Sequence, residues 1–463
     1  MIRKLVESAS SSAAAAAAAS PKEEVALRIL VDEKKNIVVY AEAGKDFVDV
    51  LLSFLTLPLG TIARIVSNGS NMKKVSVGSL SSLYQSVANL DVNQFWTDTC
   101  KELLLHPRNS SEDYCQNLKL NIDDTEKTKY FICENWECSR KSSGGLLSIF
   151  RNKRCNCGKL MNREILRKNK LLINSEGFVH DGYFIIFDDL KVTLDNVHSS
   201  VSQPKDFGIK DYNAIKVVTV NVTRKEIVEL FQISLLSNTP LTDFFLRREL
   251  FYKNVNQRSN TIVLNNVKIE SIDGVEFMLG GNSCLGSIDN LYKSILVLDP
   301  LKDFKSPNLK DKLVKSRIAQ HFKLQNQILP IDEDPIVKYS CYTNCIDGFS
   351  EGYLTTAQFY INYERWKISN PLTYVEPQSS ISGSGFVKKP SLFMVTDDLV
   401  VTPGSSITVV SFLAKTGFFS SDLDEEVICI GKKECLRILK ASLISSSALT
   451  DGLGQFIFPI KKE

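Results

Sequence analysis

The stretch GSLSSLYQS at residues 78–86 occurs again as GSIDNLYKS at residues 286–294, and this recurrence decides the architecture of the chain. A second window agrees with it: residues 225–243 and 433–451 share a Lys-Glu pair, a Ser-Leu-x-Ser run and the ending Leu-Thr-Asp. Both windows repeat at the same offset of 208 residues. Because chance similarities do not keep a common offset, the chain contains one design twice.

The two copies account for most of the 463 residues, which are too many for one ordinary domain. We predict a first copy over residues 25–245 and a second copy over residues 255–455, preceded by a disordered Ser/Ala-rich tail at residues 1–24. The duplication also provides a control. A residue present in both copies belongs to the fold, while a residue in one copy only is a candidate for function.

Local patterns predict strands and helices in each copy, as in an α/β or α+β fold. Residues 27–31 and 37–41 are short apolar runs on either side of a charged turn, which is typical of a β-hairpin. A helix with one apolar face is expected to follow, with Asp46 as its cap. Thr223 and Glu226 have the spacing of a capping box at the start of another helix.

Matching elements are expected in the second copy. Residues 183–193 and 392–402 both predict two strands around an Asp-Asp-Leu turn, and residues 215–222 and 427–431 both predict a single strand. The opening hairpin has no clear equivalent in the second copy. This copy is therefore predicted to be abbreviated at its start.

Composition indicates a soluble globular protein, with 43% apolar and 24% charged residues. The net charge of +3 gives no strong overall attraction to nucleic acid or to a membrane. The longest apolar run, residues 47–59, is shorter than the roughly 20 residues of a transmembrane helix. Four scattered histidines disfavour a histidine-based catalytic centre.

The eleven cysteines are an odd number, and the chain shows no secretory signal, so we expect thiols or metal ligands in a reducing compartment. This predicts a cytoplasmic or nuclear protein. Residues 1–20 carry Arg3 and Lys4 and one acid, Glu7, in a Ser/Ala tract. The tract is consistent either with a disordered tail or with an organelle transit peptide.

The opening of the chain resembles a known family. Residues 30–49 contain LVD and AEAGKDFVD, and residues 55–61 read LTLPLGT. With residues 81–91, the paired cysteines and residues 393–402, these resemble the plant proteins grouped as domain of unknown function 674. The resemblance implies a plant protein, often with tandem repeats, and implies no established activity. It therefore carries over no functional residues.

The best candidate site is a group of four cysteines in the first copy: Cys133, Cys138, Cys155 and Cys157. Two cysteine pairs separated by a loop are typical of a tetrahedral zinc site, and Gly158 permits a tight turn at the second pair. The spacings of four and one intervening residues depart from the usual two, so four neighbouring thiols without metal remain the alternative. Four protein ligands would make the zinc structural, because no position is left for water.

A basic run surrounds these cysteines and extends the cysteine-rich insertion over residues 133–170. Residues 140–170 contain ten Lys or Arg and one acid, Glu164. Such a run can bind phosphates, or it can be a solvated insertion. The residues that would test binding of a nucleic acid or another polyanion are Arg151, Lys153, Arg154 and Arg167.

Other charged groups predict structural roles. The pairs at residues 123–124 and 188–189 have turn-forming counterparts in the second copy, and Asp is a standard turn residue. A weaker alternative site is the group of charged residues around one helix start: Glu42, Lys45, Asp46 and Asp49. No local serine–histidine–acid arrangement predicts a catalytic triad.

Three functions follow from these patterns. The first is a non-catalytic protein that binds or scaffolds a protein partner and contains one structural zinc ion. The second is a protein that binds nucleic acid or another polyanion through residues 140–170. The third is an enzyme with its site between the two copies, where clefts commonly form.

Overall fold

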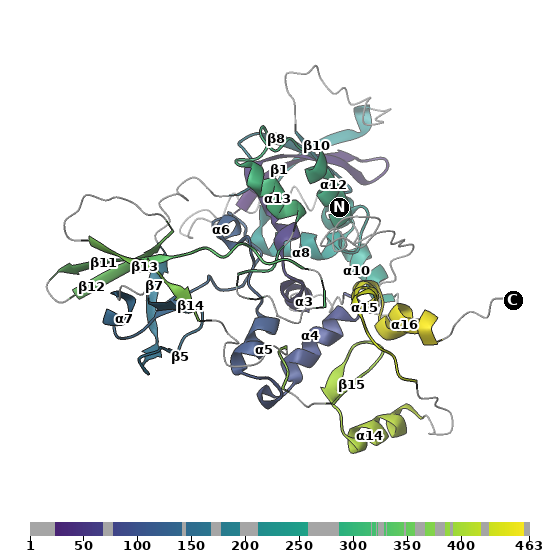
Figure 1. Cartoon of the computed structure of the whole chain (residues 1–463). Coiled ribbons are helices and arrows are strands. Elements are labelled where there is room, and N and C mark those ends of the chain that lie inside the picture. Colours follow the sequence, from purple (N-terminus) through teal and green to yellow (C-terminus); the bar gives the residue numbers. More distant parts are fainter. Residues whose placement is uncertain are drawn as a thin grey trace, which may run out of the picture.

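The computed structural model describes most of both copies (Figure 1). The described residues are 24–67, 77–140, 145–167, 177–194, 212–257, 287–315, 317–320, 322, 328–329, 331–346, 349–356, 366–375, 385–388, 392–417 and 426–457. Residues 1–23 of the predicted tail at residues 1–24 therefore lie outside them, and Glu24 is the first residue of a strand. Helices and strands are mixed in both copies, so the fold is α+β with two tandem copies.

A five-stranded antiparallel sheet, here called the N-terminal sheet, is built from the first copy. The opening hairpin is confirmed as its β1 and β2, and Asn36 in the turn between them has a φ of 53°. The alternation of buried and exposed residues along β1 places Leu27 and Ile29 in the core. In sheet order the strands are β10 (Ile215–Thr223), β1 (Glu24–Asp32), β2 (Ile37–Gly44), β8 (Tyr183–Phe187) and β9 (Val192–Leu194).

Helices of the first copy cover one face of this sheet. The capping box is confirmed, because the Thr223 hydroxyl accepts from the Glu226 N–H and the Glu226 carboxylate accepts from the Thr223 N–H. The predicted Asp46 cap is wrong: the helix begins at Lys45 behind Gly44, and Asp46 lies in its first turn. The helices are α2 (Lys45–Ser53), η1 (Phe54–Thr56), α3 (Leu59–Ser67), α8 (Arg224–Ser234), α9 (Pro240–Phe245) and α10 (Arg248–Gln257).

Two helices of the second copy complete the same core. They are α12 (Ile288–Val297) and α13 (Pro307–Val314), which lie beside the N-terminal sheet in Figure 1. Ile288 and Leu291 are buried in the core cluster that contains Leu27 and Ile29. The Ser294 hydroxyl accepts from the Val192 N–H at 2.9 Å, which fixes α12 to strand β9.

The first copy makes the reciprocal contact with the C-terminal lobe. This lobe is defined as β15 (Phe393–Val395), β16 (Val401–Pro403), α15 (Lys432–Ile444) and α16 (Ala448–Ile457). The Ser86 hydroxyl accepts from the Val401 N–H at 3.0 Å, the counterpart of the bond between Ser294 and Val192. Each copy therefore supplies a helix to the sheet of the other. The elements of the first copy involved are α4 (Leu80–Asn89), η2 (Val92–Gln94) and α5 (Asp98–Leu105).

The third part of the molecule is the cysteine lobe, residues 130–167 of the first copy with residues 339–375 of the second. Its five-stranded sheet has the order β13-β11-β12-β7-β3, and the parallel pair of β12 with β7 joins the two copies. Its elements are β3 (Tyr130–Ile132), α7 (Glu137–Arg140), β4 (Leu146–Leu147), β5 (Lys153–Arg154), β6 (Leu160–Met161), β7 (Arg163–Arg167), β11 (Ser340–Ile346), β12 (Phe349–Thr355), β13 (Trp366–Pro371) and β14 (Thr373–Tyr374). The remaining elements are α6 (Glu112–Cys115), η5 (Tyr212–Ala214) and α14 (Ser406–Thr416).

One predicted strand does not form. Residues 427–431 match β10 in sequence but have no strand structure, and Val427 is 88% exposed. The physical reason is the abbreviated start of the second copy. In the first copy β10 pairs with β1, and the described residues of the second copy contain no counterpart of β1 to supply those hydrogen bonds.

Among the described residues, no single helix is long and apolar enough to cross a membrane. One bent pair, residues 45–56 with residues 59–67, passes a test of length and composition, with a bend of 111° between its parts.

Candidate metal centre

The first cysteine pair lies where strand β3 turns into the short helix α7. Cys133 follows the last residue of β3, and Cys138 lies inside α7. The Cys138 N–H donates to the Asn135 carbonyl at 3.0 Å, which closes the turn between the two cysteines. This turn returns the chain on itself, so both thiols face the same space.

The second pair lies on the turn of the β5–β6 hairpin. The Cys155 N–H donates to the Lys159 carbonyl at 2.9 Å, and the Gly158 N–H donates to the Cys155 carbonyl at 2.9 Å. Gly158 has a φ of 86°, a conformation that favours glycine, so the predicted tight turn is confirmed. The hairpin is tied to the first pair through the Glu134 N–H, which donates to the Leu160 carbonyl at 2.9 Å.

The four predicted cysteines come together in space. Their Sγ atoms all lie within 4.8 Å of one another, and those of Cys133 and Cys157 are 3.5 Å apart. Four thiolates at the usual Zn–S bond length of about 2.3 Å form a tetrahedron with edges of about 3.8 Å. The arrangement therefore fits a tetrahedral metal ion such as zinc.

Burial differs among the four thiols. Cys133, Cys138 and Cys155 are buried beside Met161, and Cys157 is exposed. Burial raises the pKa of Cys133 to about 12 and also raises the pKa of Cys138. A backbone hydrogen bond from Lys159 lowers the pKa of Cys157 to about 7. A divalent ion held by these cysteines would supply the positive charge that buried thiolates require.

The cysteine of the second copy that corresponds to Cys133 lies in a different environment. Cys341, the counterpart of Cys133, is fully buried among Ile132, Leu147 and Leu354 in the apolar core of the cysteine lobe. It behaves there as a small apolar side chain. The cluster of four thiols belongs to the first copy.

The basic side chains around the cluster divide into two groups. Arg151 and Arg154 are exposed on the β5–β6 hairpin, and the Lys153 ammonium lies 5.7 Å from the Phe150 ring. Arg167 is turned inward: its side chain is 11% exposed, forms an ion pair with Asp113 and donates to the Tyr339 hydroxyl at 3.1 Å. Three of the four residues predicted for polyanion binding therefore lie on the hairpin, and Arg167 lies elsewhere.

The charged residues at the start of α2 have structural partners. Asp49 is fully buried, and its carboxylate accepts from the N–H groups of Phe178 and Val179 at 2.6 and 3.0 Å. Lys45 lies 2.9 Å from the same carboxylate, and Glu42 forms an ion pair with Arg28. Asp49 thus anchors the segment that leads into β8, a long-range role that no local pattern signals.

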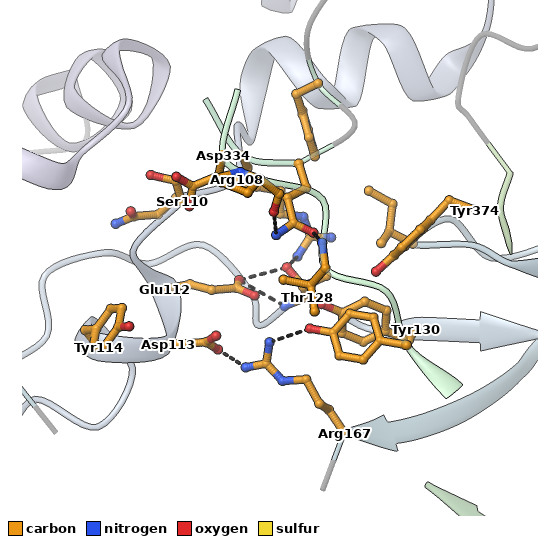
Figure 2. Close-up of a pocket in the computed structure, with 18 of the residues that line it drawn as sticks. Arg108, Ser110, Glu112, Asp113, Tyr114, Thr128, Tyr130, Arg167, Asp334 and Tyr374 are labelled. Carbon is orange, nitrogen blue, oxygen red and sulfur yellow. Dashed lines mark hydrogen bonds and ion pairs between the residues drawn. The ribbon is translucent and has the colours of Figure 1, made fainter. Parts of the chain in front are cut away.

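The sequence predicted a cleft between the two copies only as a general possibility. The structure has a cavity of about 330 Å³ there, and its lining includes three acids, Glu112, Asp113 and Asp334. Figure 2 shows Glu112 bonded to Thr128 and Asp113 paired with Arg167. Asp334 lies 2.7 Å from the Lys312 ammonium. Each of these three acids is therefore held by a donor.

The chain belongs to the family described as Protein of unknown function (DUF674), whose model matches residues 21–273 and a second time residues 269–433. The two matches agree with the two tandem copies. A search of curated proteins found no match to this chain. A search of solved structures found no match either.

Proposed function

We propose that this protein is a non-catalytic binding or scaffolding protein whose first copy holds one structural zinc ion on Cys133, Cys138, Cys155 and Cys157. The observation that carries the zinc is the convergence of four thiols from two turns within 4.8 Å of one another. Thiolate ligands favour zinc, and structural zinc sites bring two turns together in this manner.

The size of the cysteine lobe supports a structural role for the ion. Among the residues that the structure describes, its main apolar cluster has seven buried members, whereas the N-terminal sheet and its helices share a far larger core. A small core supplies little folding free energy, and a bound metal ion adds to it directly. Four protein ligands also fill the tetrahedral shell, so such an ion has no position for a water molecule or a substrate.

Elemental mass spectrometry of protein purified without chelator tests the proposal. The proposal predicts about one zinc per chain, the content of a single four-thiolate site. The double variant Cys155→Ser, Cys157→Ser should lose that zinc. Its matched control is Cys429→Ser, Cys435→Ser, which changes two thiols outside the cluster and should retain the metal. Wild-type protein without zinc, or a Cys155/Cys157 variant with full zinc, would refute the proposal.

Polyanion binding is a second candidate, because Arg151 and Arg154 are exposed on the hairpin that carries two of the cysteines. Phosphate binding by such side chains weakens steeply with salt. The test is RNA binding at two salt concentrations by Arg151→Glu, Arg154→Glu, with the inward-facing Arg167 left unchanged. Unchanged binding in that variant would remove this candidate.

A further inference from the structure

An apolar cavity of about 280 Å³ is lined by residues of both copies and shares no residue with the cysteine cluster. Its walls include residues of η1, α3 and α8 of the first copy and of α12 and α15 of the second. The side chains that define it are Phe54, Leu55, Ile62, Phe231, Ile288 and Leu443. Cavities of roughly 300 Å³ and above hold small organic ligands.

Two arginines, Arg108 and Arg317, border this apolar cavity. Arg108 donates to the Glu126 carbonyl at 2.9 Å and to the Thr128 hydroxyl at 3.4 Å. Within the described part of the chain, neither guanidinium has a carboxylate in ion-pair distance. Both can therefore accept an anion without first losing a charged partner.

The polar cavity of Figure 2 adjoins the apolar one, and the two share Arg108, Ser110, Ala319 and Phe322 in their walls. The acids of the polar cavity are already held by donors, as described above. Arg108 thus stands at the junction of an apolar space and a polar space. An occupant with an apolar body and a charged end would match both.

We propose that the apolar cavity binds a small amphipathic organic anion. The apolar body of the ligand would lie among Phe54, Phe231 and Ile288, and its anionic head would lie on Arg108 and Arg317. Removal of the apolar body from water drives binding, and guanidinium groups recognise carboxylate or phosphate through paired hydrogen bonds. The inference names a ligand class for a binding protein and does not depend on the zinc.

Titration calorimetry with three ten-carbon probes tests the ligand class. Decanoate, decanol and decylammonium share their apolar body and differ in the charge of the head. The full-length protein should bind decanoate about tenfold or more tighter than decanol, because the charged head adds charge-assisted hydrogen bonds, and should bind decylammonium weakest. Equal binding of decanoate and decanol, or binding of none of the probes, would overturn the proposal.

Three variants locate the site. Arg108→Gln, Arg317→Gln leaves the apolar walls intact and should reduce decanoate binding to the level of decanol. Ala319→Trp places a bulky ring in the shared wall and should abolish binding of both probes. Arg28→Gln changes an exposed arginine on strand β1 of the N-terminal sheet and should bind as the wild type does. Decanoate affinity that survives the double arginine variant would place the anion elsewhere and refute the assignment.

Discussion

A single aspartate–threonine contact shows how the two copies use the same residues in different surroundings. In the first copy the Asp188 carboxylate accepts from the Thr242 N–H at 2.7 Å and from the Thr242 hydroxyl at 2.6 Å. In the second copy Asp397 accepts the same two bonds from Thr450, at 2.7 and 2.9 Å. Asp188 is partly buried and Asp397 is exposed. The duplication correctly predicted a structural role for these acids, and burial, which depends on tertiary contacts, separates them.

Burial gives Asp188 a pH-dependent effect on stability. It raises the pKa of Asp188 from 3.8 to about 6, against the opposing effect of the Thr242 hydrogen bonds. Between pH 4 and 6 the folded state keeps a proton that the unfolded state has lost, so the free energy of unfolding falls as the pH rises through this window. The loss should be about 1–3 kcal/mol, because solvent screens a partly buried group.

Urea denaturation between pH 4 and 7 measures this effect in Asp188→Asn, which cannot ionise. The variant should lose the part of the pH dependence that Asp188 causes. Asp397→Asn, at the exposed counterpart in the second copy, is the matched control. An Asp188→Asn profile that still falls as steeply between pH 4 and 6 would assign the effect to other groups.

At the scale of elements, local sequence predicted those parts whose structure depends on near neighbours. The opening hairpin and the Thr223–Glu226 capping box formed as expected, because turn residues and caps act within a few positions. The strand at residues 427–431 did not form, because a strand needs a partner from elsewhere in the chain. Asp46 did not cap α2, although Asp is a suitable cap residue, because the helix begins one residue earlier, at Lys45. The convergence of the four cysteines was predictable from their spacing, while the inward turn of Arg167 depends on its distant partner Asp113.

The junction between α4 and α15 provides a test of the exchange of elements. Gly78 has a φ of 44°, and a methyl group there would collide with the carbonyl oxygen of Ser442. The next residue, Ser79, donates its hydroxyl to the Ser445 carbonyl at 2.7 Å. Gly78→Ala should therefore push α4 away from the C-terminal lobe and cost about 2–4 kcal/mol.

Hydrogen exchange and urea denaturation check this result. Gly78→Ala should lose amide protection in α15 and α16 and keep it in the N-terminal sheet. Gly454→Ala is the control: it lies inside α16 with open space around it, and it should be neutral or stabilise by about 0.5–1 kcal/mol. Equal stability of the two variants would contradict the proposed role of Gly78.

At the scale of the whole molecule, the repeat in sequence does not state which copy completes which lobe. The offset of 208 residues identifies α4 and α12 as counterparts, but only the structure shows that each packs on the sheet of the other copy. A repeated sequence specifies the same helix twice and does not specify which of the two lobes each helix packs on. The boundaries at residues 25–245 and 255–455, a plant origin and a cytoplasmic or nuclear location stay predictions.

The cysteine lobe joins the copies most directly, and this predicts that a metal ion bound by the first copy also stabilises strands of the second. Trp136, between Cys133 and Cys138, lies against Gly352 of β12, where a side chain would collide with the indole. Strand β7 pairs with β12 at Leu166 and Arg167.

A zinc-loaded protein treated with a chelator should therefore show faster amide exchange at residues 340–355 as well as at residues 130–167. Residues 24–44 should keep their protection, because their sheet has its own large core. Faster exchange restricted to residues 130–167 would show that the cluster acts within the first copy alone, and equal loosening of the N-terminal sheet would show that the zinc stabilises the whole chain as one unit.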